Sequence, residues 1–321
     1  MDAAVVTACG QPPVVARRET PRPGDGQVRV RVAAAPITPL DVLCATGTSY
    51  FGAPATPYVP GVQGVGQLDD GRPVWFSTTA GMRPGDGSMA EHCVVPYADV
   101  VTLPDADDTL IAALGLSAVA AQMALTWRGE LSPGEQVVVL GAGGVVGQAA
   151  VQLARLHGAR RVVAAARSAA AQERARALGA DAVVALADSD TVDDLAVRLT
   201  AACDGPADLV LDPLFGVPAA AALRTLAPRG RLVNLGGAAG EIAPFDSATL
   251  RSRSLRLLGY TNNELDATQR AGAIRSIAEH TAAGRLTVAY ETVPLAEVGD
   301  AWSRQAQGRA ANRIVVTMPA Q

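Results

Sequence analysis

The chain has 321 residues, of which 49% are hydrophobic and 18% charged, and its formal net charge is −4. This length allows about two domains with cores of their own, and the composition excludes a disordered chain. The basic residues form no block or tail, so a nucleic-acid partner has no electrostatic support and none is expected.

Cysteine usage and the apolar stretches restrict the class further. The four cysteines are far apart, with no CxxC pair and no Cys/His cluster, so neither a disulfide framework nor a structural zinc site is expected. The first residues lack the basic region and long apolar core of a signal peptide. The apolar stretch 110–125 is shorter than the roughly 20 residues of a membrane helix. We expect a cytoplasmic protein with no membrane partner.

Residues 1 to about 115 have the pattern of short strands and turns. The stretch QVRVRVAAAP, residues 27–36, opens with strict Val/Arg alternation, which is the period of a half-buried strand. Further strands are predicted at 64–68, 72–76 and 90–96. Because glycine and proline separate these runs, this part of the chain predicts an all-β barrel or sandwich.

From about residue 118 strand-like and helical runs alternate. Strands are predicted at 136–140, 160–166, 181–186, 208–212, 230–236 and 254–260. Helices are predicted at 147–158, 169–179, 191–202 and 217–227. This alternation implies right-handed βαβ crossovers and a parallel sheet, which is an α/β fold class.

The last part of the chain again has the sequence pattern of β-strands. After a helix near 265–284, strands are predicted at 286–294 and 312–318, and this segment is expected to rejoin the first domain. The predicted domain limits are therefore 1–117, 118–262 and 263–321.

The stretch QVVVLGAGGVVGQAAVQLA, residues 136–154, has the strand, glycine turn and helix of a dinucleotide-binding βαβ unit. Small residues let the backbone approach a pyrophosphate, and the helix N-terminus directs N–H groups at it. The third glycine departs from GxGxxG spacing, and an ordinary glycine-rich turn is the alternative. The order of the surrounding elements favours nucleotide binding. The predicted cofactor contacts here are Ala142, Gly143, Gly144, Val145, Val146 and Gly147.

The end of the second strand of this domain selects the cofactor. In an NAD site an Asp or Glu about 20 residues beyond the turn binds the ribose 2′-hydroxyl. Here the strand ends in Arg167 and Ser168, with no acid. A guanidinium and a hydroxyl would bind a 2′-phosphate, so we predict NADPH, although Arg167 as a solvated surface residue is the alternative. Asn234 and Gly236 are added to the cofactor set, with a turn cap as the alternative for Asn234.

Seven segments, taken in chain order, resemble the medium-chain dehydrogenase/reductase superfamily. The resemblance is to its zinc-free quinone oxidoreductase (zeta-crystallin-like) or enoyl reductase branch. The segments that carry the resemblance are PGDGQVRVRVAAAPITPLD, PYVPGVQGVGQL, GSMAEHCVVP, LSPGEQVVVLGAGGVVGQAAVQLARLHGA, ALGAD, DLVLD and GRLVNLG. The resemblance implies a GroES-like β-barrel domain with a Rossmann domain of doubly wound parallel sheet, and an active site between them. It also implies NAD(P)H hydride transfer and frequent dimers or tetramers; we expect a homodimer.

The resemblance also identifies where this chain departs from related branches. The catalytic Cys of the zinc branch would fall at Thr38, and its His and Glu at Val62 and Gln63, so no metal is expected. Within the quinone-reductase pattern, Thr38 stands where Asn is usual and Ala120 where Thr often lies near the nicotinamide. Ala171 stands where a lysine often supports the 2′-phosphate. These changes argue against ordinary quinone activity.

Without a metal to polarise a carbonyl, conjugate reduction suits the expected site best. Hydride from NADPH would go to the β-carbon of an enone or enoyl thioester, for which we expect a role in secondary metabolism. The carbonyl oxygen would need hydrogen-bond donors. The candidate catalytic residues are Tyr50, Thr38 and Gln63, on positions where the family has an active-site tyrosine or cleft-facing residues. A packing tyrosine and a turn hydroxyl are the alternatives for the first two. Asp41 is interpreted as a barrel residue that accepts loop N–H bonds.

Two other functions are compatible with the sequence. One is an NADPH:quinone oxidoreductase, which keeps the redox class and changes the acceptor. The other is a family member that binds NADP without redox turnover, or uses it in a non-redox step; the residues at positions 38 and 120 motivate it.

Overall fold

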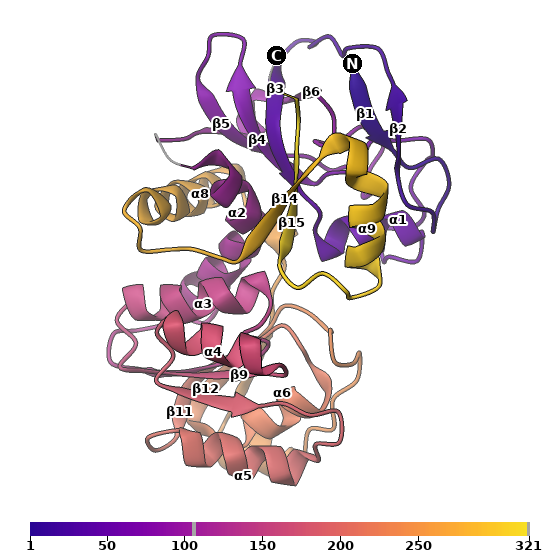
Figure 1. Ribbon diagram of the computed structural model, residues 1–321. Helices are drawn as coiled ribbons and strands as arrows, with labels where there is room; N and C mark the ends of the chain where they lie inside the picture. The colour runs from indigo at the N-terminus through magenta and orange to yellow at the C-terminus, as the bar shows by residue number, and fades with distance from the viewer. Residues whose placement is uncertain (105–106, 320–321) are drawn as a thin grey trace. The chain divides into compact units, whose positions relative to one another are not determined.

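The computed structural model describes residues 1–104 and 107–319, and the chain divides into two compact units (Figure 1). Unit 1 comprises Met1–Gly115 together with Asp266–Gln321, and unit 2 comprises Leu116–Leu265. The chain therefore leaves unit 1 once and returns to it once. The limits expected from the sequence, 117 and 262, lie close to these two crossings.

Unit 2 is built on a six-stranded sheet in which every neighbouring pair is parallel. Its strands are β8 (Gln136–Val139), β9 (Arg161–Ala166), β10 (Ala182–Ala185), β11 (Ala207–Asp212), β12 (Leu226–Asn234) and β13 (Arg256–Gly259). They lie in the order β10-β9-β8-β11-β12-β13, so the strand order reverses between β8 and β11. This confirms the predicted doubly wound α/β sheet.

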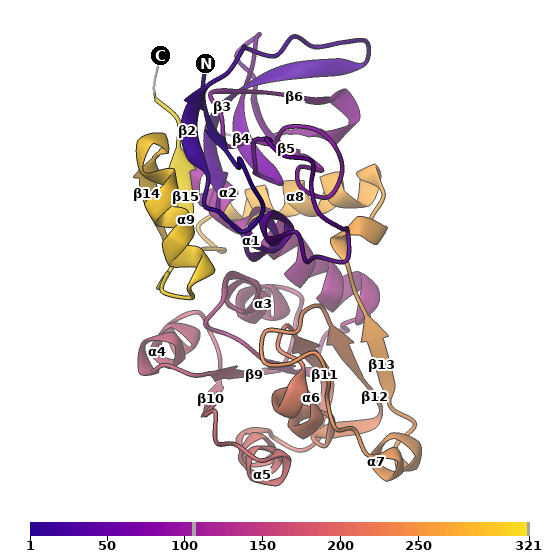
Figure 2. The same ribbon diagram turned by 90° about the vertical axis from the view of Figure 1, so that its right-hand side faces the viewer.

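Helices cover both faces of this sheet. They are α3 (Val145–Leu156), α4 (Ala169–Ala177), α5 (Val192–Ala202), α6 (Gly216–Leu223) and the short α7 (Ser247–Ser252). Helices α3 and α4 lie on one face, and α5 and α6 on the other (Figure 2). Valine, leucine and alanine fill the core between layers, which is why the strands read as near-continuous apolar runs.

Strand β3 (Gln27–Pro36) organises unit 1 because it has three partners. One edge pairs with β4 (Gln63–Leu68); the other pairs with β6 (His92–Pro96) near its start and with β15 (Arg313–Thr317) near its end. All three pairings are antiparallel. The remaining strands of this seven-stranded sheet are β5 (Pro73–Ser77), β7 (Val100–Thr102) and β14 (Tyr290–Pro294). Strand β15 thus joins the C-terminal segment to the N-terminal sheet.

The rest of unit 1 surrounds this sheet. Its other elements are β1 (Asp2–Val5), β2 (Val14–Arg17), α1 (Pro39–Thr46), α8 (Ala267–Ala282) and α9 (Val298–Ala306). Strands β1 and β2 pair antiparallel as a separate ribbon. Helix α9 belongs to the apolar core that also contains residues of β1, β3 and β15, so residues distant in sequence form one core.

Two sequence-based expectations are wrong in detail. The helix predicted at 217–227 ends at Leu223, and β12 already begins at Leu226, because Thr225 turns the chain and its hydroxyl bonds back to the Ala222 carbonyl. Helix α1 was not expected within the strand-rich part. Its signal is local: Thr38 and Asp41 form a capping box around Pro39.

The longest apolar helical run is Asp108–Arg128, which combines α2 (Asp108–Met123) with a π-helical turn, Ala124–Arg128. Among the described residues it alone is long and apolar enough to cross a membrane, with a mean hydropathy of 1.7. However, 61% of its apolar window is buried in the protein, and core helices of soluble proteins pass the same test. It is also kinked at Gly115, where φ is 31° and ψ −131°.

Candidate functional site

The glycine turn between β8 and α3 is shaped by close backbone approach. Gly141 has a φ of 63°, and a Cβ at Gly147 would lie 2.6 Å from Cα of Ala142. The side-chain amide of Gln148 donates to the Gly143 carbonyl over 2.9 Å and fixes the turn from inside the helix. Only glycine fits at 141 and 147, so these two positions are determined by the turn itself.

This turn fits a diphosphate. Gly144 is the N-cap of α3, no side chain caps the helix, and its first turn contains no acidic residue. Gly144 is exposed and Val145 and Val146 are partly so, while the Gly144 N–H donates to the Gly141 carbonyl at 3.0 Å. A twelve-residue helix with an uncapped N-terminus is suited to hold phosphate groups. The predicted contacts 142–147 therefore lie together on one turn.

The loop that follows β11 packs directly on the glycine turn. A Cβ at Gly141 would meet Cγ of Pro213 at 3.0 Å and Cδ2 of Leu214 at 3.1 Å. This loop begins at Asp212, a carboxylate with no exposed surface. Burial raises the pKa of Asp212, and hydrogen bonds from Phe215 N–H, Leu214 N–H and the Asn234 amide oppose that rise. The sequence reasoning missed Asp212, although an acid at the end of a parallel strand is a signal for a site at that edge.

Phe215 is held in a strained backbone conformation. Its φ is 58° and its ψ −157°, a region that costs a non-glycine residue about 1–3 kcal/mol. Oδ1 of Asp212 accepts hydrogen bonds from both Leu214 N–H and Phe215 N–H, at 2.9 and 2.8 Å. The Phe215 ring packs edge-on against Phe245, with 5.7 Å between centroids. These hydrogen bonds and the ring contact stabilise Phe215 in a backbone conformation that a non-glycine residue otherwise disfavours.

Asn234 ties the neighbouring loop to the same carboxylate. Its amide donates to Oδ2 of Asp212 at 3.0 Å and to the Gly236 carbonyl at 2.8 Å. A Cβ at Gly236 would lie 2.9 Å from the Pro213 carbonyl oxygen, so this position also has to be glycine. Asn234 and Gly236, which were predicted as cofactor contacts, therefore lie beside the loop that follows β11. The Asn234 side chain links the two loops by hydrogen bonds.

The predicted selectivity residues lie at the end of β9. The Arg167 side chain is 69% exposed, and its Nη1 is 3.7 Å from Oδ1 of Asp188, which is itself 94% exposed. The Ser168 hydroxyl accepts from Ala171 N–H and caps α4. Ala171, where relatives were expected to carry lysine, is buried against Gly143. Arg167 is therefore the cation available to an anionic group at this strand end.

Thr38 and Asp41 form a closed hydrogen-bonded pair inside unit 1. The Thr38 hydroxyl donates to Oδ2 of Asp41 at 2.5 Å, and the same carboxylate accepts from the N–H groups of Thr38 and Val62. Asp41 therefore accepts loop N–H bonds as predicted, although it lies on helix α1 of unit 1 and not on a barrel strand. Because the Thr38 hydroxyl hydrogen is committed to Asp41, a substrate oxygen would have to compete for it.

Arg313 completes this buried cluster from the C-terminal segment. Nη1 of Arg313 donates to the Ile37 carbonyl at 2.8 Å, and burial lowers the pKa of its guanidinium to about 10 despite the attraction of Asp41. Arg313 begins β15, so the cluster joins the α1 N-terminus to the strand that returns the chain to this unit. The hydrogen bonds from Thr38 and Val62 oppose the rise in the pKa of Asp41 that burial causes, and the charge of Arg313 adds a smaller effect in the same direction.

The other two predicted catalytic residues have opposite surroundings. Gln63 is 1% exposed, and its Oε1 accepts a hydrogen bond from the Trp75 indole at 3.1 Å. Tyr50 is 79% exposed and packs on Phe51, with 4.2 Å between ring centroids. Of the three, Tyr50 alone presents its polar group on the surface of unit 1.

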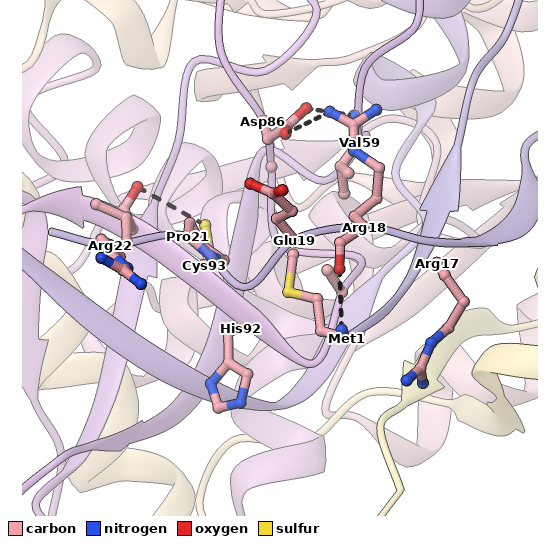
Figure 3. A pocket seen from close by; sticks show the side chains of 13 residues that line it. Met1, Arg17, Arg18, Glu19, Pro21, Arg22, Val59, Asp86, His92 and Cys93 are labelled. Carbon is pink, nitrogen blue, oxygen red and sulfur yellow. Dashed lines mark hydrogen bonds and ion pairs between the residues drawn. The ribbon is translucent and has the colours of Figure 1, made fainter.

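Among the described residues, neither a metal-ligand group nor the pocket of unit 1 includes any of the predicted site residues. Among these residues no three His, Cys, Asp or Glu side chains gather as metal ligands. Unit 1 contains a pocket of about 620 Å³, shown in Figure 3, in which Arg18 turns toward Asp86. The two form an ion pair at 3.2 Å, and Asp86 also accepts from Val59 N–H at 2.8 Å. This carboxylate is already satisfied by protein donors.

Known proteins are similar to this chain in sequence and in fold. A family model described as zinc-binding dehydrogenase matches residues 145–279. The chain is 32% identical over 268 residues to quinone oxidoreductase-like protein 2 of Rattus norvegicus, covering 80% of this chain and 74% of that protein. It is 33% identical over 320 residues to one component of the phenolphthiocerol/phthiocerol polyketide synthase of Mycobacterium tuberculosis, covering 93% of this chain. The chain spans only 14% of the length of that polyketide synthase component.

A solved structure of a quinone oxidoreductase has a similar fold. The quinone oxidoreductase of Thermus thermophilus, also solved with NADPH, is 29% identical to this chain and has a TM-score of 0.83. The match covers 99% of this chain and 100% of that protein. The likeness therefore extends over both units.

Proposed function

Because the chain belongs to the quinone oxidoreductase branch of the medium-chain dehydrogenase/reductase superfamily, we propose that it is an NADPH-dependent, zinc-independent reductase of an activated C=C bond. An oxidoreductase with a nicotinamide cofactor follows from the family alone. The proposal adds the cofactor form and a substrate class, an enone or an enoyl thioester.

The uncapped N-terminus of α3 at the glycine turn carries the cofactor half of the proposal. Residues 142–147 would hold the diphosphate, and Arg167 with Ser168 would hold the 2′-phosphate of the adenosine ribose. Arg167 is exposed and its present partner is the highly exposed Asp188. Exposed ion pairs of this kind contribute only about 0–1 kcal/mol, so a phosphate can displace Asp188 at little cost.

The substrate half of the proposal follows from the donors of unit 1. When bound, the reduced nicotinamide supplies a hydride to the substrate. The chain then has to stabilise negative charge on the carbonyl oxygen and to deliver a proton to the α-carbon. We assign the donor role to Tyr50, whose hydroxyl is on the exposed loop that follows α1. Thr38 and Gln63, which are bonded within unit 1, would shape the wall of the site.

A quinone is the second candidate acceptor. It is favoured by the names of the relatives, since quinone oxidoreductases match most of the chain. The polyketide synthase relative favours the first candidate, because polyketide chains are carried as thioesters. The two acceptors make different demands, since a quinone is already highly electrophilic and needs less help from a donor such as Tyr50.

The test is the loss of NADPH absorbance with a panel of enones, enoyl thioesters and quinones. We expect turnover with enones or enoyl thioesters, and we expect Tyr50→Phe to lower kcat by about tenfold or more, as for loss of one transition-state hydrogen bond. Turnover with quinones alone would favour the second candidate. Binding of NADPH with no turnover on any panel member would favour a redox-inactive protein, and no binding would overturn the proposal.

We also propose a homodimer. Strand β13 is the last strand of the unit 2 sheet, and no described strand pairs with its outer edge. Leu257 on this strand is 38% exposed. An open edge of this kind is a template for pairing with another strand. Light scattering of the purified protein tests the dimer, and a monomeric mass at micromolar concentration would contradict it.

A further inference from the structure

The sheet of unit 2 determines which half of a bound dinucleotide lies over which loops. In doubly wound sheets the pyrophosphate lies at the first strand–helix turn, and the adenosine ribose is read at the end of the second strand. Here these are the glycine turn after β8 and Arg167 after β9. The other half of the molecule therefore lies over the strands beyond the reversal, β11 and β12. This placement rests on the proposed function.

The loops after β11 and β12 are locked to each other at this place. Ala239 N–H donates to the Leu214 carbonyl at 2.7 Å, and Leu235 N–H to the Asp212 carbonyl at 2.9 Å. A Cβ at Gly216 would meet the Ala239 carbonyl oxygen at 3.1 Å. Backbones at this separation leave no room for side chains between them, so one loop cannot shift without the other.

Asp212 is the side chain common to these contacts. Its Oδ1 holds Leu214 and the strained Phe215, and its Oδ2 holds the Asn234 amide, which also reaches the Gly236 carbonyl. The same loop covers Gly141 of the glycine turn. One fully buried carboxylate therefore ties the loops after β11 and β12 together, and the first of these loops packs on the glycine turn through Pro213 and Leu214.

We propose that Asp212 is a positioning residue for the nicotinamide half of the cofactor. It touches neither cofactor nor substrate in this role; it fixes the backbone of the loops after β11 and β12, so that the surface under the nicotinamide is formed before binding. Preorganisation of this kind favours binding because the loops need not be ordered by the ligand. Asn234 is its partner, and the strained Phe215 backbone is a consequence of its hold.

The experiment compares whole and half cofactors by fluorescence titration or calorimetry. Asp212→Asn retains the shape but places an amide donor opposite the Asn234 amide donor. We expect this variant to bind NADPH about tenfold more weakly and adenosine 2′,5′-bisphosphate, the adenosine half, as the unaltered protein does. Asp208→Asn is the matched control, because Asp208 lies at the other end of β11 and its carboxylate accepts from Gln136 N–H at 2.7 Å. This control should bind both ligands normally.

Asn234→Ala provides a second route if the first variant folds poorly. It removes the same hydrogen bond from the other side, so its effect on NADPH affinity and that of Asp212→Asn should not add in the double variant. Additive losses would mean that Asn234 contacts the cofactor directly and would overturn the pairing. Equal weakening of NADPH and of the adenosine half, or no weakening of either, would overturn the positioning role. If the unaltered protein binds neither ligand, the proposed function fails instead.

Discussion

The indole N–H of Trp75 donates to Oε1 of Gln63 over 3.1 Å, and the backbone of Gly115 lies against the same carboxamide. A Cβ at position 115 would lie 2.5 Å from Cδ of Gln63. Gly115 is also the residue at which α2 kinks and after which the chain leaves unit 1. The buried glutamine therefore fixes the course of the chain at this crossing.

The substitution Gly115→Ala tests this relationship. It adds a side chain at a positive φ and forces the Gln63 carboxamide away from Trp75, so we expect the free energy of unfolding to fall by about 1–3 kcal/mol. Urea unfolding followed by circular dichroism measures it. Gly272→Ala is the control, because this glycine lies inside α8 with nothing within 4 Å of its Cβ position. It should stabilise the protein by up to about 1 kcal/mol; an equal loss in both variants would contradict the argument.

A second prediction concerns the hydroxyl of Thr38. Thr38→Val removes the N-cap of α1 and one donor to Asp41, so we expect a loss of about 1–2 kcal/mol in the free energy of unfolding. Thr38→Ser retains both bonds and should lose much less. If kcat falls in Thr38→Val and is retained in Thr38→Ser, and if these changes follow the changes in stability, then Thr38 supports turnover only by stabilising helix α1. A loss of kcat in the stable Ser variant would instead indicate that the methyl group contacts substrate.

The sequence predicted the unit 2 sheet well because each element carries its own signal. Strands β8, β9 and β11 are apolar runs bounded by glycine and charge, and the glycine turn lies where the spacing placed it. Strand β3 was predicted with its observed limits, since Val/Arg alternation marks its start and Pro36 is its last residue. Local patterns suffice where local physics decides the structure.

The contacts that shape the site could not be predicted in the same way. Arg313 reaches Ile37, and Asp212 reaches Asn234, across 276 and 22 residues of chain. No spacing rule connects such pairs, because the sheet order decides which side chains meet. The positive φ of Phe215 could not be predicted from the sequence either, because non-glycine residues rarely adopt this conformation.

The third prediction concerns cofactor selectivity. Arg167→Ala removes the exposed guanidinium at the end of β9, so we expect the Kd for NADPH to rise about tenfold, the equivalent of about 1.4 kcal/mol, and the Kd for NADH to stay constant. Titration with both coenzymes measures the ratio. Arg176→Ala, an exposed arginine on α4 that pairs with Glu173 at 3.5 Å, is the control and should change neither value. A parallel loss for NADH would assign Arg167 to general attraction of anions.

The last prediction is a pH dependence. Nη1 of Arg231 donates to Oε1 of Glu135 at 2.8 Å, and the Arg231 side chain is 7% exposed. Burial alone would raise the pKa of Glu135, but hydrogen bonds from Arg231 and Ser132 N–H and the charge of Arg231 outweigh it and hold the pKa below its ordinary 4.5. A lowered carboxyl pKa contributes stability above the unfolded value and loses it as pH falls through the folded value.

Glu135→Gln should therefore lower the free energy of unfolding by about 2 kcal/mol at pH 7. This is less than the 3–5 kcal/mol of a fully buried pair, because the Glu135 side chain is 22% exposed. The difference between the unaltered protein and the variant should shrink as pH falls from about 5 to about 3, since protonation removes the same charge. Glu173→Gln, in an exposed pair, should show a difference near zero at every pH. A Glu135→Gln difference that stays constant down to pH 3 would mean that the carboxylate stabilises the fold through shape and hydrogen bonding, and not through its charge.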